Sequence, residues 1–407
     1  MGKQPKSYPY PRSIVETNAM LRRSQNQLVH KSGTPIKRDN EYDIITAARP
    51  SQTNSMAVDE DGTDFSYFTA IHFGSSGKLM YMLIDTGAAN TWVMGANCTS
   101  ETCKKHNTFG DKDSDTLQAT GDAFNLTYGT GSVSGMTVND TAEIAGMSVP
   151  LSFGAASITS NDFLAYPMDG ILGLGRSASN TMEYPTAMQA IQATGSLDYN
   201  MFGVHLQRNS DGSTDGELNF GAPDSSKYTG ELSYTDTDPE GGLWEIPLDD
   251  ASFDSKPYKF GGKSAILDTG TSFILIPPDD AQRLHAQIPQ SEQDGETFNI
   301  PCSTDIPLQI IISNAAYNIS TEDYVGNPVK GPNLCVSNII GRQAFGPDQW
   351  LLGDVFLKNV YTVFDFDKNR IGKFSFGPVN THPSERYSLC ISHSRYSEAA
   401  KQTNTIS

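Results

Sequence analysis

The sequence predicts a mostly β protein built from two similar halves. It contains 36 glycines among its 407 residues. From residue 65 onward, short runs of alternating apolar residues are separated by Gly, Asn and Asp turns. Stretches with helical periodicity are few, and helices are expected around residues 184–194 and 278–288. The chain is long enough to form two domains, each with its own core.

The evidence for two similar halves is a tripeptide, Asp-Thr-Gly, that occurs twice in the same apolar setting. Asp85 follows the apolar run 79–84, and Asp268 follows the run 265–267. At nearly the same distance downstream of each acid, two apolar residues precede a glycine, at 171–173 and again at 351–353. Repetition of this kind indicates a duplicated fold unit.

The repeated acids also suggest a chemistry. Each carboxyl stands on a tight glycine turn at the end of a buried strand, where polar partners are few. Two such carboxyls that face each other at about 3 Å cannot both ionise, so they share one proton and can act as a base and an acid. A single Asp-Thr-Gly would more simply be an ordinary turn, and it is the duplication that favours the catalytic interpretation.

Several motifs together carry a resemblance to a known family. They are Ile84-Asp85-Thr86-Gly87, Trp92, Tyr128-Gly129-Thr130-Gly131, Asp169-Gly170-Ile171-Leu172-Gly173, Leu267-Asp268-Thr269-Gly270-Thr271-Ser272 and Leu351-Leu352-Gly353-Asp354-Val355-Phe356. In this order the chain resembles the pepsin family of aspartic peptidases, and within it the secreted fungal members. The resemblance covers about residues 64–377. It implies the pepsin-like bilobal acid protease fold, with two pseudo-symmetric β-lobes and an active-site cleft between them.

The resemblance implies that Asp85 and Asp268 hold one water between them. The ionised acid would take a proton from this water as it attacks a peptide carbonyl, while the protonated acid stabilises the gem-diol oxygen. The threonines beside the acids would bond across the lobe interface, and the glycines would leave room for water and substrate. The residues implied to support the acids are Thr86, Gly87, Thr269, Gly270 and Thr271.

One asymmetry between the two sites has a consequence for pH dependence. Thr271 can donate a hydrogen bond to Asp268, whereas Ala88 cannot do so for Asp85. Because the loss of a donor raises the pKa of a carboxyl, we expect an activity optimum shifted slightly upward.

Residues 128–132 form a second candidate element, and taken alone they are a hairpin turn. By resemblance, this flap hairpin closes over substrate through Tyr128, Gly129 and Thr130. The Trp92 indole would donate a hydrogen bond to the Tyr128 hydroxyl, and otherwise Trp92 is a core aromatic.

The resemblance also implies two apolar pockets, one on each side of the scissile bond. The residues expected to line them are Leu83, Tyr128, Phe163, Met168 and Ile171 on one side, and Ile266 and Leu351 on the other. Bulky hydrophobic residues should therefore be preferred on both sides of the cleaved bond.

The charge distribution suggests a zymogen. The net charge is −18, yet residues 1–50 hold nine Lys and Arg against four acids. A basic segment ahead of an acidic body can cover it, although a disordered linker is the simpler alternative. We expect a prosegment at 1–63, an N-terminal lobe at 64–235, a C-terminal lobe at 236–377 and a polar tail at 378–407.

Other functions find little support in the sequence. The acidic body makes nucleic acid an unexpected partner, and no apolar run is long enough to span a membrane. No metal-ligand spacing, nucleotide-binding loop or serine-peptidase motif occurs, so no metal or cofactor is expected. The expected partners are polypeptide substrates and pepstatin-type inhibitors, and the protein is expected to be a monomer. A pepsin-like binding protein that has lost catalysis is the rival hypothesis, but such proteins usually alter the acids, the triplet glycines or the flap tyrosine.

The cysteines and glycosylation sequons bear on the compartment. The resemblance implies the disulfides Cys98–Cys103 and Cys302–Cys335, and leaves Cys390 over. Sequons begin at Asn97, Asn125, Asn139 and Asn318. Together these features favour a secreted, extracellular protein, with the vacuole as the alternative. The N-terminus leads into no apolar run typical of a signal peptide, for which a truncated start is the preferred explanation.

Overall fold

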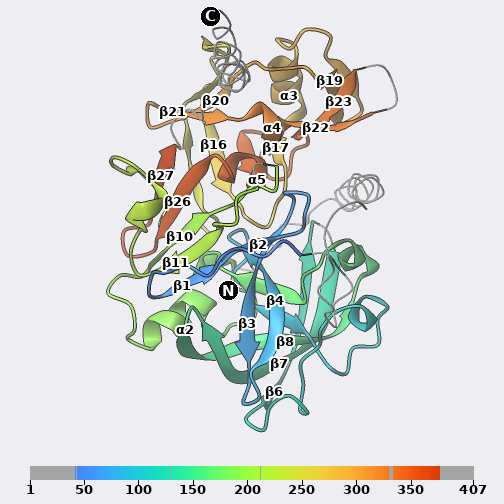
Figure 1. Cartoon of the computed structure of the whole chain (residues 1–407), viewed down its shortest axis with the longest axis vertical. Helices are drawn as coiled ribbons and strands as arrows, with labels where there is room; N and C mark the ends of the chain where they lie inside the picture. Colours follow the sequence, from blue (N-terminus) through green and yellow to red (C-terminus); the bar gives the residue numbers. More distant parts are fainter. Residues whose placement is uncertain (1–41, 43, 130, 211, 330–332, 376–407) are drawn as a thin grey trace, which may run out of the picture. The chain divides into compact units, whose positions relative to one another are not determined.

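The computed structural model describes residues 42, 44–129, 131–210, 212–329 and 333–375, and strands dominate this part of the chain (Figure 1). The prediction of a mostly β fold with two lobes is confirmed. The expected tail, from residue 378, lies outside the described residues, as does most of the expected prosegment.

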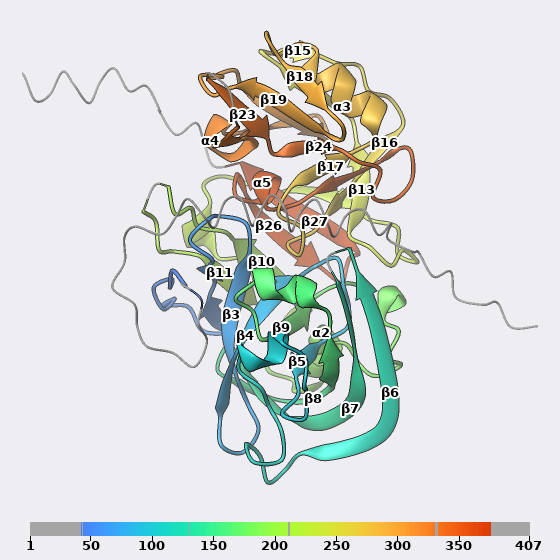
Figure 2. The ribbon, with the colours of Figure 1, turned by 90° about the vertical axis from the view of Figure 1, so that its right-hand side faces the viewer.

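One large sheet makes up most of the first half of the chain. Its eight strands, in spatial order, are β2 (Asp59–Glu60), β3 (Tyr67–Phe73), β4 (Lys78–Asp85), β9 (Gly170–Gly173), β5 (Trp92–Met94), β8 (Met147–Thr159), β7 (Gly131–Ile144) and β6 (Gln118–Tyr128). The last three are the longest, and Figure 2 shows them curving side by side at one end of this half.

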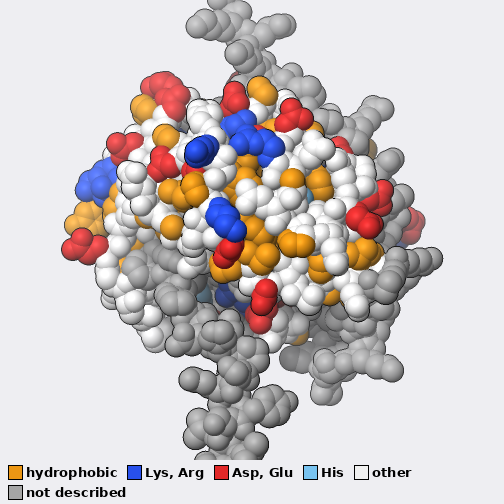
Figure 3. All heavy atoms as spheres, turned by 90° about the horizontal axis from the view of Figure 1, so that it is seen from above, with side chains coloured by type: hydrophobic (Ala, Val, Ile, Leu, Met, Phe, Trp, Pro, Cys, Tyr) orange, Lys and Arg blue, Asp and Glu red, His pale blue; other side chains and the backbone are white. Residues whose placement is uncertain are grey.

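Three smaller sheets make up the second half. A five-stranded sheet holds β13 (Glu245–Leu248), β16 (Lys263–Leu267), β25 (Gln349–Leu352), β17 (Ile274–Ile276) and β24 (Ile339–Gly341). The two four-stranded sheets hold β15 (Lys256–Pro257), β14 (Asp250–Phe253), β20 (Leu308–Ile312) and β21 (Ala315–Ile319), and β18 (Glu292–Asp294), β19 (Thr297–Pro301), β23 (Leu334–Ser337) and β22 (Val325–Pro328). On the face of this half drawn in Figure 3, acidic, basic and apolar side chains are interspersed.

A six-stranded sheet takes strands from both halves and so joins them. Its order is β1 (Ser55–Ala57), β11 (Glu217–Phe220), β10 (Met201–His205), β26 (Val360–Asp365), β27 (Arg370–Ser375) and β12 (Ser233–Asp236). The junction lies between β10 and β26, where Phe202 pairs with Phe364 and their rings stack at 4.8 Å.

The duplication predicted from the sequence is visible in the strand pairing. In the first half β4 runs parallel to β9, with Asp85 opposite Gly173. In the second half β16 runs parallel to β25 and ends directly before Asp268. A Cβ at Gly173 would lie 2.6 Å from the backbone of Ala89, so this position next to the turn of Asp85 excludes any side chain. The equivalent Gly353 is equally crowded by backbone.

Helices are short, and their ends differ from those expected. The first is α2 (Ala187–Ala193), which begins later than predicted because Thr186 and Gln189 form a capping box. The second is α3 (Pro278–His285), which has proline at its first position and ends before the predicted residue 288. The remaining α-helices of the described chain are single turns, α4 (Thr321–Tyr324) and α5 (Asp354–Leu357).

Candidate active site

The two acids lie on matching turns and are both buried, each with 6% of its surface exposed. Asp85 is the last residue of β4, and Asp268 directly follows β16. Each carboxyl accepts a hydrogen bond from the backbone N–H two residues further along its own turn, over 2.9 Å in the first and 2.8 Å in the second. The structure therefore brings together the two residues that the sequence singled out.

The threonines of the two triplets lock the turns to each other. The Thr86 backbone N–H donates to the Thr269 hydroxyl over 3.1 Å, and the Thr269 N–H donates to the Thr86 hydroxyl over 3.0 Å. Each hydroxyl in turn donates across the interface, to the carbonyl of Leu267 and to that of Ile84. All four bonds are buried, so the two halves are held in register by a closed and symmetric network.

The triplet glycines lie against the opposite acids, a close approach that the sequence did not predict. A Cβ on Gly87 would lie 2.6 Å from an oxygen of Asp268, and a Cβ on Gly270 would lie 2.6 Å from the carboxyl carbon of Asp85. Each glycine therefore makes room for the opposite acid, and not only for water and substrate. The Gly87 N–H also donates to Asp268 over 3.1 Å, so one turn directly contacts the carboxylate of the other.

The hydrogen-bond donors around the two acids are unequal. Asp268 accepts a short bond of 2.6 Å from the Thr271 hydroxyl. Asp85 has no comparable side-chain donor on its own turn and instead accepts the backbone N–H of Ala88 over 2.9 Å. A hydroxyl donor stabilises an ionised carboxylate, so the arrangement favours charge on Asp268.

The pKa values of the two acids are shifted in line with these unequal donors. Burial raises the pKa of Asp85 well above its usual range, and the neighbouring charge of Asp268 raises it further. Burial also raises the pKa of Asp268, but the Thr271 hydroxyl and the backbone N–H groups of Gly270 and Gly87 oppose that shift. The donors around Asp268 therefore favour the negative charge on Asp268 and the shared proton on Asp85.

The flap hairpin begins where β6 ends. Tyr128 is the last residue of this strand, and its hydroxyl accepts a hydrogen bond of 2.9 Å from the Trp92 indole. Phe163 packs edge-on against both rings, with centroid distances of 5.5 Å to Trp92 and 6.4 Å to Tyr128. Gly129 lies in the turn that follows, and Thr130 lies outside the described residues.

The predicted pocket residues fall into two apolar clusters beside the acids. Side chains alternate along a strand, so Leu83 and Ile266 share a face with the acids two residues further on. Leu83 pairs with Ile171, and Ile266 pairs with Leu351 in the equivalent register. The first cluster also includes the predicted residues Phe163 and Met168, with Tyr128 packed against it.

The second cluster contains aromatic residues that sequence reasoning missed. Phe65 and Phe273 pack 5.2 Å apart, and both belong to the cluster of Ile266 and Leu351. The Ser272 hydroxyl donates to the Phe65 carbonyl, which ties the segment before β3 to the second catalytic turn. The signal for Phe273 was its place in the apolar run after the second triplet. Phe65 has no comparable signal.

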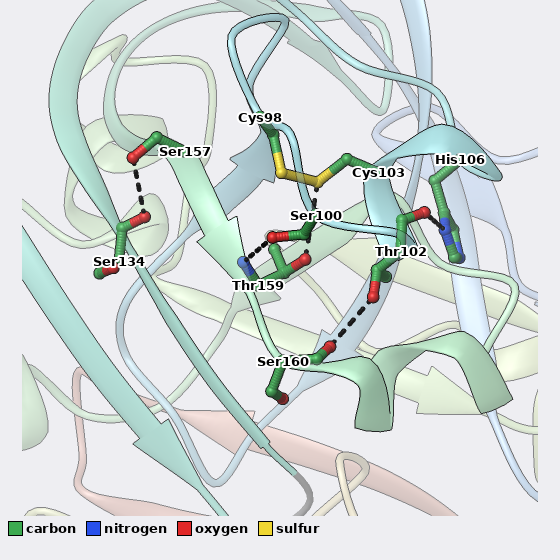
Figure 4. Close-up of a disulfide and its surroundings, with 9 residues drawn as sticks. All are labelled: Cys98, Ser100, Thr102, Cys103, His106, Ser134, Ser157, Thr159 and Ser160. Atoms are coloured by element: carbon green, nitrogen blue, oxygen red, sulfur yellow. Dashed lines mark hydrogen bonds between the residues drawn. A yellow bond between two sulfur atoms is a disulfide. The ribbon is translucent and has the colours of Figure 1, made fainter.

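Both disulfides expected from the resemblance are formed, Cys98–Cys103 and Cys302–Cys335. Figure 4 shows the surroundings of the first. Within its loop, the Ser100 hydroxyl accepts from the Thr159 N–H and the Thr102 hydroxyl donates to the Ser160 carbonyl. Because Ser160 directly precedes the single turn Asn161–Ala165 that holds Phe163, this loop supports one wall of the first cluster.

Comparison with known proteins decides the family. Residues 66–375 match the family model described as eukaryotic aspartyl protease. The chain belongs to this family. It is an aspartic-type endopeptidase. The match begins just after Phe65 and includes both Asp-Thr-Gly turns, the flap hairpin, the first cluster and all of the second cluster except Phe65.

The similar relatives are fungal and vertebrate peptidases. The chain is 47% identical to the probable aspartic-type endopeptidase CTSD of Arthroderma benhamiae, over 84% of this chain and 67% of that protein. It is 44% identical to the aspartic-type endopeptidase ctsD of Aspergillus fumigatus, over 83% of this chain and 71% of that one. It is also 33% identical to pepsin A of Sus scrofa, over 77% and 82% respectively.

Within the described residues, no group of three or more His, Cys, Asp or Glu side chains could hold a metal ion. In the same part of the chain, no helix has both the length and the apolar character needed to cross a bilayer.

The inequality between the acids generates a test at Ala88. Substituting Ala88→Ser adds a hydroxyl donor beside Asp85, which should stabilise its ionised form and lower its pKa. Because Asp85 carries the shared proton, the alkaline limb of the kcat/KM profile should move to lower pH. The measurement is a pH profile with a fluorogenic peptide.

Thr271→Ala is the complementary variant and should raise the pKa of Asp268, which moves the acidic limb of the kcat/KM profile to higher pH. An alkaline limb that stays in place in Ala88→Ser would show that another donor already serves Asp85.

Proposed function

We propose that this aspartic peptidase acts through a water held between Asp85 and Asp268. The observation that carries the proposal is the buried pair on matching turns, with the pKa of Asp85 raised further than that of Asp268 by the charge of its neighbour. Asp268, as the base, takes a proton from the water while the water oxygen attacks the peptide carbonyl carbon. Asp85 gives its proton to the carbonyl oxygen, and a gem-diol forms.

Collapse of the gem-diol completes the reaction. The proton gained by Asp268 passes to the amide nitrogen, and the carbon–nitrogen bond breaks. One gem-diol hydroxyl returns its proton to Asp85 as the carboxylic acid product forms, so the pair regains its starting protonation state. The products are one new carboxyl and one new amine, and neither a metal nor a covalent intermediate takes part.

This mechanism predicts that both carboxyls are equally necessary. Asp85→Asn and Asp268→Asn should each reduce turnover by several orders of magnitude, because groups that act as a unit are not replaceable singly. The assay is hydrolysis of a denatured globin at pH 4 with and without pepstatin, which we propose as an inhibitor. Asp279→Asn, an exposed carboxyl of α3, is the matched control and should behave as the unmodified enzyme. Robust activity in either catalytic variant, with the fold intact by circular dichroism, would refute the shared-proton mechanism, whereas an unmodified protein that binds pepstatin but cleaves nothing would support the non-catalytic binding hypothesis.

We further propose that cleavage occurs between bulky hydrophobic residues. The two clusters beside the acids support this, since Leu83 with Ile171 and Ile266 with Leu351 supply matching apolar walls. Burial of a large apolar side chain contributes about 1.5–3 kcal/mol. Phe, Leu, Tyr and Met should therefore be favoured on both sides of the bond.

The specificity prediction uses the flap. Thr130 offers only a neutral hydroxyl, so a lysine buried before the scissile bond would have no counter-charge there. A peptide library should show poor cleavage after Lys relative to Leu, and Thr130→Asp should raise Lys acceptance. Thr130→Asn, which is similar in size to Asp but uncharged, is the control and should not. Lys accepted as readily as Leu by the unmodified enzyme would refute this pocket assignment.

We propose that the protein is a zymogen because its N-terminal segment is basic and because Tyr42, within that segment, contacts the folded body. Tyr42 lies in the predicted prosegment, with its ring 4.9 Å from that of His106 and its hydroxyl donating to the Leu164 carbonyl over 2.8 Å. Strands β1 and β2 also lie within 1–63, yet they pair with β11 and β3. A cut at residue 63 would remove an edge strand from two sheets. We therefore propose that the activation cleavage precedes Ser55.

The zymogen proposal predicts a pH-dependent activation. The full chain should be inactive at neutral pH and should gain activity on acidification, as carboxylates of the body protonate and release the basic segment. Peptide hydrolysis followed over time, with sequencing of the new N-terminus, measures both events. An Asp268→Asn precursor is the control and should remain uncleaved alone. Full activity of the uncut chain at neutral pH would exclude this regulation.

Export is the remaining proposal. Two disulfides in the described chain support an oxidising compartment, and the sequons are consistent with passage through the secretory pathway. We propose that the protein is secreted, with the vacuole as the alternative destination, and that it acts as a monomer on polypeptide substrates.

A further inference from the structure

An apolar patch stands exposed on the outer face of the strands that carry the flap hairpin. Among the described residues, the exposed large hydrophobic side chains are Ile158 at 62%, Tyr199 at 58% and Met136 at 39%. Two of these three lie on neighbouring strands, Ile158 on β8 and Met136 on β7. Exposed apolar groups that cluster in this way call for a covering group or partner.

Strand register places a glycosylation sequon beside this patch. Asn125 of β6 pairs with Ser134 of β7, and Ser134 pairs with Ile158 of β8. Residues directly opposite one another share a face of the sheet, so these three side chains form one row across the strands. Met136, two residues beyond Ser134, lies on the same face. The row is two strand spacings wide, roughly 10 Å.

The sequon itself is presented outward. Asn125 and Thr127 are both exposed, while Leu126 between them is buried with 8% of its surface exposed. Alternation along β6 therefore places the asparagine amide and the threonine hydroxyl on the outer face together. The Asn125 side chain forms no hydrogen bond with another described residue, so a sugar attached there displaces no internal contact.

Asn139, whose sequon lies in the same sheet, is the contrasting case. Its side chain is half-buried, and its carbonyl oxygen accepts a hydrogen bond of 2.7 Å from the Ser152 hydroxyl. It lies on β7, paired on one side with Gln118 and on the other with Ser152. A glycan at Asn139 would have to break that bond and fit over both neighbouring strands.

We propose that Asn125 carries an N-linked glycan and that this glycan covers the apolar patch of Ile158 and Met136. A glycan is bulky and solubilising, and the row of side chains leads its first sugars from Asn125 over Ser134 to Ile158. The group that covers the patch is thus a glycan attached to this chain and not a second protein. The inference rests on passage through the secretory pathway and is independent of the peptidase mechanism.

Site occupancy is the first test. The full chain is fused to a secretion signal and collected from the medium of a filamentous fungal host, which ensures passage through the glycosylating compartment. Mass spectrometry of peptides released with and without endoglycosidase should show Asn125 occupied in most copies and Asn139 bare. Thr127→Ala should abolish the modification at Asn125, whereas Thr127→Ser, which preserves the sequon, should retain it. A bare Asn125 in the secreted protein overturns the proposal.

Covering of the patch is the second test. Asn125→Gln should increase binding of an apolar dye and aggregation on warming, relative to the glycosylated protein. Adding Ile158→Thr and Met136→Thr to Asn125→Gln should reverse both changes, because the apolar surface is then gone. The matched control is the exposed substitution Thr127→Ser, which preserves the sequon and should change neither measurement. Dye binding that is the same with and without the Asn125 glycan, or that the two threonine substitutions fail to reverse, refutes the covering role. A dimer that forms through the patch in the glycosylated protein refutes it as well.

Discussion

The site depends on the exchange of hydrogen bonds between Thr86 and Thr269. These side chains satisfy each other's backbone N–H groups and the carbonyls of Ile84 and Leu267, all of them buried. A buried polar group left unpaired costs about 1–3 kcal/mol, so neither turn is stable in this form without the other. The consequence is that neither half of the chain contains a complete site, and the acids meet only when both halves fold together.

Proton placement then follows from packing. Each triplet glycine receives the opposite carboxyl, which draws both acids out of water and onto one another. Burial raises both pKa values, and the Thr271 hydroxyl breaks the symmetry by favouring charge on Asp268. The duplicated fold thus supplies two equivalent positions, and one hydroxyl, present on one turn and absent at Ala88 on the other, makes the two carboxyls unequal in the sense that the proposed mechanism requires.

The sequence predicted some elements of the fold and the site better than others. The repeated triplet and the apolar pair with glycine were sufficient for the duplicated turns, because only glycine fits beside Ala89. The sequence did not predict the helix ends correctly, because the start of α2 depends on a capping interaction by Thr186. Strands β1 and β2 were missed because they are only three and two residues long, too short for an alternating pattern to show. The second of them ends at Glu60, which is completely buried, with backbone N–H groups as its partners. Local composition does not reveal a carboxyl that is buried by its own turn.

That buried carboxyl adapts the fold to acid. Burial raises the pKa of Glu60 from 4.5 to about 8, and the charges of Asp61 and Asp64 add to the shift. A folded-state pKa above the unfolded value means that this contribution to stability is complete below about pH 4.5 and is lost as the pH rises through 8. The effect of Lys373 on stability changes at a higher pH, because burial lowers the pKa of its ammonium group to about 7. Its penalty is constant below pH 7 and is relieved only above it, so Lys373 does not change the stability between pH 4.5 and 7. His285 does change it, because burial lowers its pKa from 6.5 to about 4 and the fold loses stability as the pH falls through that range. Glu60 and His285 thus act in opposite directions in the acidic range in which the catalytic pair is proposed to work, and the contribution of the buried carboxyl offsets the cost of the buried imidazole there.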